Sequence, residues 1–203
     1  MKKIAIIVGL CLCTVAGFAQ VEHKVSHYPN GNLRYEGDFK DGKPVGELRR
    51  YHENGKLSGI QTFDNEGNSK VVCYAGSGEL LAEGNYKGQK RDGLWQFYGA
   101  GEYLFMIETY KDGLRIGESL IFSKEGKVLQ RMNYKDGKLD GERIQYYPYG
   151  NVMAKYTYKD GVLEGPYSYF YETGQKNEEG AYQNGKPHGI WRSYAEDGSV
   201  EET

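Results

Sequence analysis

The stretch YEGDFKDGKPVG at residues 35–46 decides the fold class, because it places an Asp-Gly pair directly after a segment with aromatic anchors. Asp-Gly and Asn-Gly tolerate the positive φ angles that a two-residue turn requires. Between segments rich in Tyr, Val and Ile, these pairs predict β-hairpins. They recur at residues 112–113, 136–137, 160–161 and 184–185. The stretch therefore predicts a hairpin that the chain repeats.

Aromatic residues mark the period of this repeat. The spacing within one series of anchors is 24 residues, except for 23 between Tyr51 and Tyr74, and a second series lies midway. The first series is His27, Tyr51, Tyr74, Tyr98, Phe122, Tyr146, Phe170 and Tyr194. The second series is Phe39, Phe63, Tyr86, Tyr110, Tyr134, Tyr158 and Tyr182. A turn about every 12 residues leaves strands of about 5–7 residues, so each unit is predicted to be two short antiparallel strands.

Composition and residue pattern agree with short strands. Trp95 and Phe97 share one face of the segment 93–97, as in a strand, and the prolines lie near the expected turns. The 19 Tyr and 29 Gly accompany only 38% hydrophobic residues, so tyrosine has to supply much of the burial. The sequence predicts an all-β fold, an elongated single-layer antiparallel β-meander or solenoid of about seven 24-residue hairpin repeats. The predicted repeats are approximately 27–50, 51–73, 74–97, 98–121, 122–145, 146–169 and 170–193, with a partial repeat at 194–203.

Residues 1–19 have the pattern of a secretory signal peptide. Lys2 and Lys3 precede an apolar stretch from Ile4 to Val15, and a small-x-small site ends at Ala19. We expect cleavage after Ala19, a repeat domain at 20–203 without a transmembrane segment, and a periplasmic or extracellular location. Cys73 is then the one remaining thiol, which leaves either a buried small hydrophobic residue, as we expect, or an intermolecular link.

Charge argues against nucleic acid as a partner. Without Lys2 and Lys3 the chain has 24 basic and 28 acidic residues, a net charge of about −4. Phosphate binding needs a concentrated basic surface, whereas lysines and acids alternate along most of this chain.

No catalytic, metal or cofactor site is predicted. The histidines His23, His27, His52 and His188 have no Ser, Cys or acid in a recognisable arrangement beside them. The Lys-Asp-Gly turns place a lysine beside the turn's one carboxylate, which opposes a cation such as Ca²⁺. We therefore do not expect an enzyme.

The unit at 51–73 is irregular. It is one residue short and lacks the glycine expected near residue 70. We expect either a local bulge or kink, or a bend at which a partner is admitted.

Six aromatic residues are candidates for partner binding. Trp95 and Trp191 occupy equivalent positions that carry Leu48, Ser119, Arg143 and Tyr167 in other units, and this variability suggests an accessible or groove-lining face. Tyr147, Tyr149, Tyr169 and Tyr171 form the second group. They are expected either to form a partner surface on the face opposite the ring ladder, or simply to cover the sheet.

The chain resembles the MORN repeat, and more closely its bacterial variant form. Residues 35–46 are similar to the family's Y-x-G-x-[WF]-x-x-G-K-x-x-G core, and similar stretches begin at Glu83 and Glu179. The spacing is mostly 24 instead of the family's usual 23, and several units replace the Glu-Gly pair. The resemblance implies a β-hairpin solenoid used for protein or lipid contact. Bacterial relatives are often labelled antitoxin components, which suggests neutralisation of a partner protein.

These observations predict a non-enzymatic, exported repeat scaffold that mediates protein–protein interaction in the cell envelope. Membrane lipid binding through aromatics and lysines, and carbohydrate binding through Tyr and Trp faces, remain alternatives, as does an antitoxin-like role. The sequence does not identify the partner protein.

Overall fold

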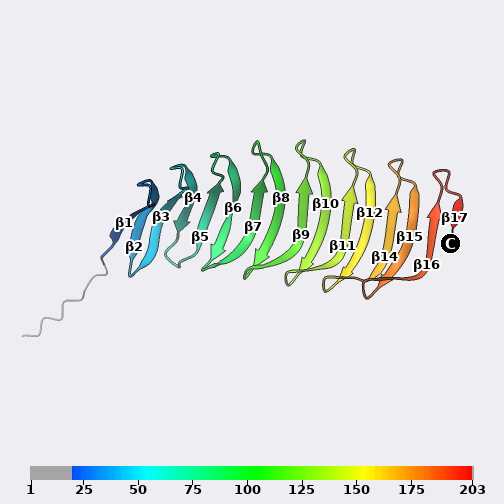
Figure 1. The fold of residues 1–203 in the computed structure, drawn as a ribbon. Coiled ribbons are helices and arrows are strands. Elements are labelled where there is room, and N and C mark those ends of the chain that lie inside the picture. Colours follow the sequence, from blue (N-terminus) through cyan, green and yellow to red (C-terminus); the bar gives the residue numbers. More distant parts are fainter. Residues whose placement is uncertain (1–19, 203) are drawn as a thin grey trace, which may run out of the picture.

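The computed structural model describes residues 20–202, which form one open antiparallel sheet of 17 strands without a helix (Figure 1). Each strand pairs with the strands that precede and follow it in the sequence, with one interruption where β12 pairs with both β13 and β14. The predicted all-β meander is confirmed. The predicted signal peptide lies outside the described residues. None of the described residues forms a helix that could cross a membrane.

The strands have 6–9 residues, except β13 with 2 and β17 with 3. Their bounds are β1 Glu22–His27, β2 Leu33–Lys40, β3 Lys43–Tyr51, β4 Leu57–Phe63, β5 Ser69–Tyr74, β6 Leu80–Lys87, β7 Lys90–Tyr98, β8 Leu104–Lys111, β9 Leu114–Phe122, β10 Val128–Lys135, β11 Lys138–Tyr146, β12 Val152–Lys159, β13 Val162–Leu163, β14 Gly165–Phe170, β15 Lys176–Gln183, β16 Lys186–Tyr194 and β17 Val200–Glu202.

The two long edges of the sheet use different turns. Along one edge, tight turns such as Asp41-Gly42 have positive φ at both residues, 51° and 76°. An aspartate or asparagine tolerates this conformation and a glycine adopts it freely, which explains the recurring dipeptide. Along the other edge the turns are longer, as at His52, where Gly55 N–H donates to the His52 carbonyl at 2.9 Å.

Most hairpins contain a bulge that begins at a glycine. In the β2–β3 hairpin, Gly46 and Glu47 are two additional residues between the pairs Asp38↔Val45 and Gly37↔Leu48. Gly46 has a φ of 63°, which a residue with a side chain rarely adopts. Equivalent glycines with positive φ are Gly93, Gly117, Gly141, Gly165 and Gly189.

The irregular unit lacks this bulge. The β4–β5 pairing continues without a register shift from Phe63↔Ser69 to Gly59↔Cys73. Five residues, 64–68, separate Phe63 from Ser69, whereas four separate Phe39 from its partner Pro44. One residue gained in the turn and two lost with the bulge account for the 23-residue spacing. The β4–β5 hairpin therefore has no bulge, whereas at the other edge of the sheet this unit does contain a register shift, at Ser58 between β3 and β4, of the kind that the next unit also has.

Burial is concentrated on one face of the sheet, which we call the ladder face and define by the side of Trp95. Trp95 is 2% exposed and lies over Gly84, and its indole N–H donates to the Asn85 carbonyl at 3.0 Å. The rings of Tyr86 and Tyr110 pack against it edge-on, with centroids 5.2 and 6.3 Å away. Other buried residues on this face are Leu48, Ser69, Val71, Ala82, Glu108, Tyr110, Ser119, Met132 and Ala154.

Replacement of Gly84 by alanine tests this close packing. A Cβ at residue 84 would lie 2.3 Å from Trp95 Cδ2, so the indole has to move. Overpacking of this kind costs about 1–3 kcal/mol, and we expect the urea midpoint followed by tryptophan fluorescence to fall accordingly. Gly76→Ala is the control, because its Cβ would meet nothing closer than 3.7 Å. Equal midpoints for the two variants would contradict the packing described.

Candidate functional site

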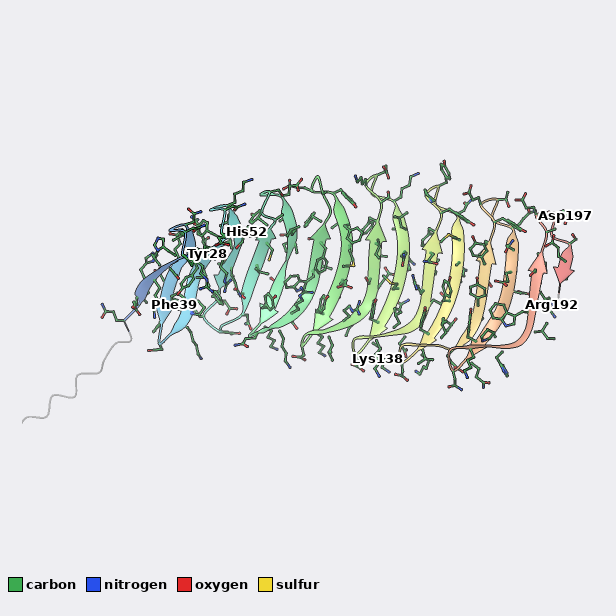
Figure 2. All side chains as sticks on the ribbon, viewed as in Figure 1. Tyr28, Phe39, His52, Lys138, Arg192 and Asp197 are labelled. Carbon is green, nitrogen blue, oxygen red and sulfur yellow. The ribbon has the colours of Figure 1, made fainter. Side chains whose placement is uncertain are left out.

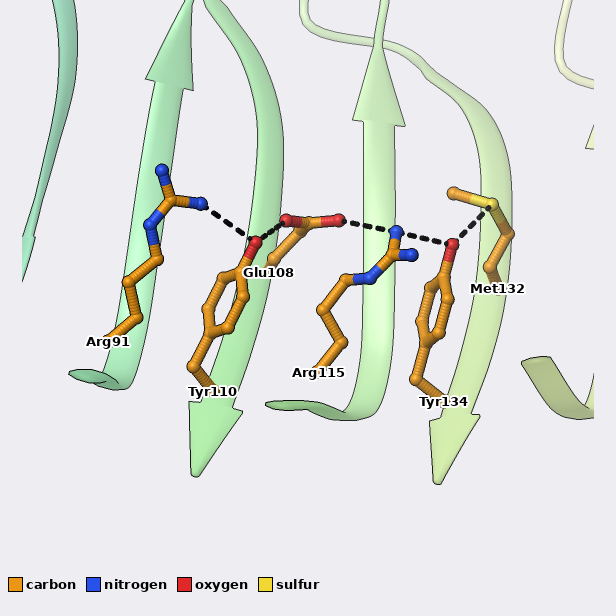
Figure 3. Close-up of polar contacts among 6 residues, drawn as sticks. All are labelled: Arg91, Glu108, Tyr110, Arg115, Met132 and Tyr134. Atoms are coloured by element: carbon orange, nitrogen blue, oxygen red, sulfur yellow. Dashed lines mark hydrogen bonds and ion pairs between the residues drawn. The ribbon is translucent and has the colours of Figure 1, made fainter. Parts of the chain in front are cut away.

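A chain of polar contacts crosses the middle of the ladder face (Figure 3). Arg91 donates to the Tyr110 hydroxyl at 3.1 Å, and that hydroxyl donates to the carboxylate of Glu108. Arg115 bridges from Glu108, at 3.3 Å, to the Tyr134 hydroxyl, at 2.9 Å. The chain therefore links strands β7 to β10 through side chains as well as through the backbone.

This polar chain is satisfied within the protein. Glu108 is 4% exposed, and its carboxylate has both a phenol donor and a guanidinium partner. Burial, followed by the neighbouring Glu108 carboxylate, raises the pKa of Tyr110. A buried carboxylate that is paired in this way holds its neighbours in one arrangement. Among residues 20–202, no three His, Cys, Asp or Glu side chains are grouped so that they could hold a metal ion.

The two tryptophans that the sequence singled out differ in exposure. The prediction of an accessible face is wrong for Trp95, because Gly84 leaves room for its indole to pack flat against the backbone. Trp191 lies over Gly180 in the same way and contacts the rings of Tyr167 and Tyr182, but it is only half-buried. Both tryptophans are therefore parts of the ring ladder.

The four candidate tyrosines do not share one face. Tyr169 lies on the ladder face, two residues after Tyr167, so its predicted place on the opposite face is wrong. Tyr147 and Tyr171 lie in turns and donate to carbonyls of the next unit, Phe170 at 2.7 Å and Tyr194 at 2.8 Å. Tyr149 is 81% exposed at the tip of its turn.

The contacts of Tyr147 and Tyr171 repeat along the edge with the longer turns. Tyr28 donates to the Tyr51 carbonyl at 2.8 Å, and His52 Nε2 lies 2.9 Å from the Tyr74 carbonyl. Figure 2 shows Tyr28 and His52 along this edge, opposite the edge that carries Lys138. These side chains connect consecutive turns and stabilise the stacking of units.

On the face opposite the ladder, tyrosines of the first anchor series bind carboxylates. The Tyr98 hydroxyl donates to Glu83 at 2.7 Å, and Tyr51 and Tyr194 make the same contact with Glu36 and Glu179, each at 2.6 Å. Each carboxylate lies 15 residues before its tyrosine, in the Glu-Gly pair whose glycine lies on the ladder face.

A continuous apolar stripe also runs along this opposite face, and the sequence analysis missed it. Each of the strands β5 to β12 and β14 contributes one side chain to it. Aromatic anchors of the first series alternate with other apolar residues, of which most are aliphatic. Leu81 is 45% exposed and Phe105 is 37% exposed. A 24-residue spacing of Leu81, Phe105, Leu129 and Met153 could have revealed the stripe. Its members are Tyr74, Leu81, Tyr98, Phe105, Phe122, Leu129, Tyr146, Met153 and Phe170.

The stripe is confined to the central part of the ribbon. Strand pairing places its members side by side, because Ala82↔Phe97 sets Leu81 beside Tyr98 and Met106↔Ile121 sets Phe105 beside Phe122. The same row carries Ser58 at one end and Asn177 at the other. The described residues include no second layer over this face, so the stripe is open to a partner.

Comparison with known families identifies the repeat. The family described as MORN repeat variant matches residues 25–41, 44–65, 115–136, 139–160 and 163–184, together just over half of the chain. No curated protein matches the chain.

The pairing of Tyr98 with Glu83 predicts a titration that can be observed directly. Burial and the Glu83 carboxylate raise the pKa of Tyr98 to about 12. Because the folded-state pKa lies above the unfolded value of about 10, the stabilising effect is complete below pH 10 and is lost as the pH rises toward 12. In absorbance titrations at 295 nm, the difference between wild type and Tyr98→Phe should show one phenol ionising near pH 12. Glu83→Gln should move that step toward lower pH, and an unchanged step would contradict the contact.

Proposed function

The chain belongs to the MORN repeat variant family, and from this membership and its surface we propose that it is a non-enzymatic, exported scaffold that binds a protein partner. The observation that carries the proposal is the open apolar stripe on the face opposite the ladder. A contiguous apolar row on a sheet without a second layer is the kind of surface that protein interfaces cover.

The chemistry of the stripe favours protein over lipid or glycan. Its aliphatic members, such as Leu81 and Leu129, alternate with its aromatic rings, so the stripe offers mixed nonpolar contact area and not an unbroken row of rings for stacking on sugars. On the same face Glu83 lies beside Lys70, and Glu179 lies beside Lys176 and Arg192, so this face carries charges of both signs and lacks the concentrated cationic surface that an anionic membrane attracts. Flotation with anionic liposomes and binding to a glycan array are the measurements that would favour these alternatives.

The exported location is part of the proposal and rests on the pattern of residues 1–19. We expect the protein recovered from its native envelope or medium to begin at Gln20, as measured by intact mass. Recovery of a chain that retains Met1 in the cytoplasm would contradict export.

Substitution within the stripe tests partner binding. We expect the double variant Leu81→Gln, Phe105→Gln to recover at least about tenfold less partner from native envelope extract than wild type, because interface binding is concentrated in a few buried apolar residues. Leu114→Gln is the matched control, since Leu114 is 49% exposed but lies at the edge of the tight turns. Quantitative mass spectrometry of the captured proteins gives the readout. Capture that is equal for all three proteins would contradict a role for the stripe, and capture of nothing would contradict the scaffold proposal.

A further inference from the structure

The irregular hairpin differs from the others in the residue that faces its second-series ring. On the ladder face, Phe63 is paired with Ser69. In the remaining hairpins the residue paired with the equivalent ring is large or rigid: Pro44, Arg91, Arg115, Leu139, Leu163 and Pro187. The loss of the bulge therefore also replaces a bulky side chain by a small one.

A groove lies where the bulky side chain is missing. Ser69 is also paired with Tyr86 on the next strand, so it lies between the strands that carry the Phe63 and Tyr86 rings. Strands two positions apart are separated by about 10 Å, which leaves room between two rings for one inserted side chain. The groove lined by Phe63, Tyr86 and Gln61 has a volume of about 580 Å³. Ser69 is itself 5% exposed, and its hydroxyl accepts from Nε2 of the groove-lining Gln61 at 2.8 Å, so both side chains have their hydrogen-bond partners within the protein.

The protein itself shows what fits between rings at this spacing. In the next hairpin, the Arg91 guanidinium lies 4.4 Å from the Trp95 ring and 5.2 Å from the Tyr110 ring. Arg115 lies 4.1 Å from the Tyr134 ring. Leucine or proline takes the corresponding place in four further hairpins. The space therefore suits an aliphatic side chain or a guanidinium.

Charge decides between these two occupants. The groove lining carries the cations Lys43 and Arg50 and one carboxylate, Glu66. Arg50 donates to Gln61 Oε1 at 2.9 Å, which holds its guanidinium beside the groove. A guanidinium has five N–H donors, so Arg50 retains donors for an anion. A second guanidinium would be repelled here, whereas an aliphatic side chain next to a carboxylate would be attracted.

We propose that this groove binds an acidic peptide segment of the partner protein, with a leucine or proline side chain between Phe63 and Tyr86 and a neighbouring carboxylate on Arg50. This inference rests on the proposed function and names the chemistry of one part of the partner. It also explains why the irregular unit keeps both rings but has lost the side chain that elsewhere lies beside the second-series ring.

The test uses a probe of defined composition, a phage-displayed library of random 12-residue peptides, selected against the protein expressed from its full sequence. We expect enriched peptides to contain leucine or proline next to aspartate or glutamate. Ser69→Leu fills the groove with the side chain found in the equivalent place at Leu139 and Leu163, and should weaken an enriched peptide at least tenfold in fluorescence polarisation. Arg50→Gln changes only an exposed rim residue and should weaken the same peptide several-fold.

Ser168→Leu is the matched control. Ser168 lies on the opposite face, at the position that Leu120 and Ile144 occupy in preceding units, so leucine fits there and peptide binding should be unchanged. Enriched peptides that bind Ser69→Leu and Arg50→Gln as tightly as wild type, or a library that yields no peptide dependent on these residues, would overturn the groove. Envelope capture separates the two proposals. A partner recovered equally by wild type and Ser69→Leu overturns the groove and leaves the scaffold standing, whereas recovery of no partner overturns the scaffold.

Discussion

Burial in this protein depends on how closely a side chain can approach the backbone of the neighbouring strand, because no second layer covers the described sheet. A large side chain can be buried on a single layer if it lies over a residue without a side chain. Trp95 over Gly84, Leu48 over Gly37 and Trp191 over Gly180 satisfy this requirement. Where the underlying residue is larger, as at Glu108, the covering residue is Ser119. Two units depart from this pattern, because Met132 with Arg143 and Tyr156 with Tyr167 combine two large side chains at the equivalent places.

The same glycine connects the two faces of the sheet. Each Glu-Gly pair directs the glycine to the ladder face and the carboxylate to the opposite face, where Tyr51, Tyr98 or Tyr194 donates to it. Phe122 and Phe170 lack a hydroxyl, and the residues 15 positions earlier are an isoleucine and a lysine, not a glutamate. Tyrosine thus occurs in each unit that supplies the carboxylate. The residue types at the Glu-Gly pair and at the anchor ring are therefore linked. Where the glutamate is absent, as before Phe122 and Phe170, the anchor on the opposite face can be an apolar phenylalanine.

The fold could be predicted from the sequence because turn chemistry and ring spacing are local. Asp-Gly pairs and a 24-residue period specify hairpins that stack in order, and the structure confirms that meander. Exposure could not be predicted in the same way. Trp95 is buried because Gly84, eleven residues earlier, lies beneath it, and variability at the equivalent positions gave no indication of that contact. Tyr169 lies two residues after Tyr167, so strand alternation alone places both rings on the ladder face, and grouping Tyr169 with the turn residues Tyr147 and Tyr149 overlooked that alternation.

In the β4–β5 hairpin, the loss of the bulge changes which side chain is paired with the Phe63 ring. A glycine bulge adds two residues to one strand, and its removal with one extra turn residue leaves strands β4 and β5 in uninterrupted register. Uninterrupted register places Ser69 opposite both Phe63 and Tyr86, whereas in a bulged hairpin one residue faces the ring before it and a different residue faces the ring after it. The small side chain of Ser69 is therefore paired with both rings, whereas in the other hairpins each ring is paired with a residue of its own. The distinct side-chain pairing at this point of the ribbon therefore follows from backbone register, without any residue type that the other repeats lack.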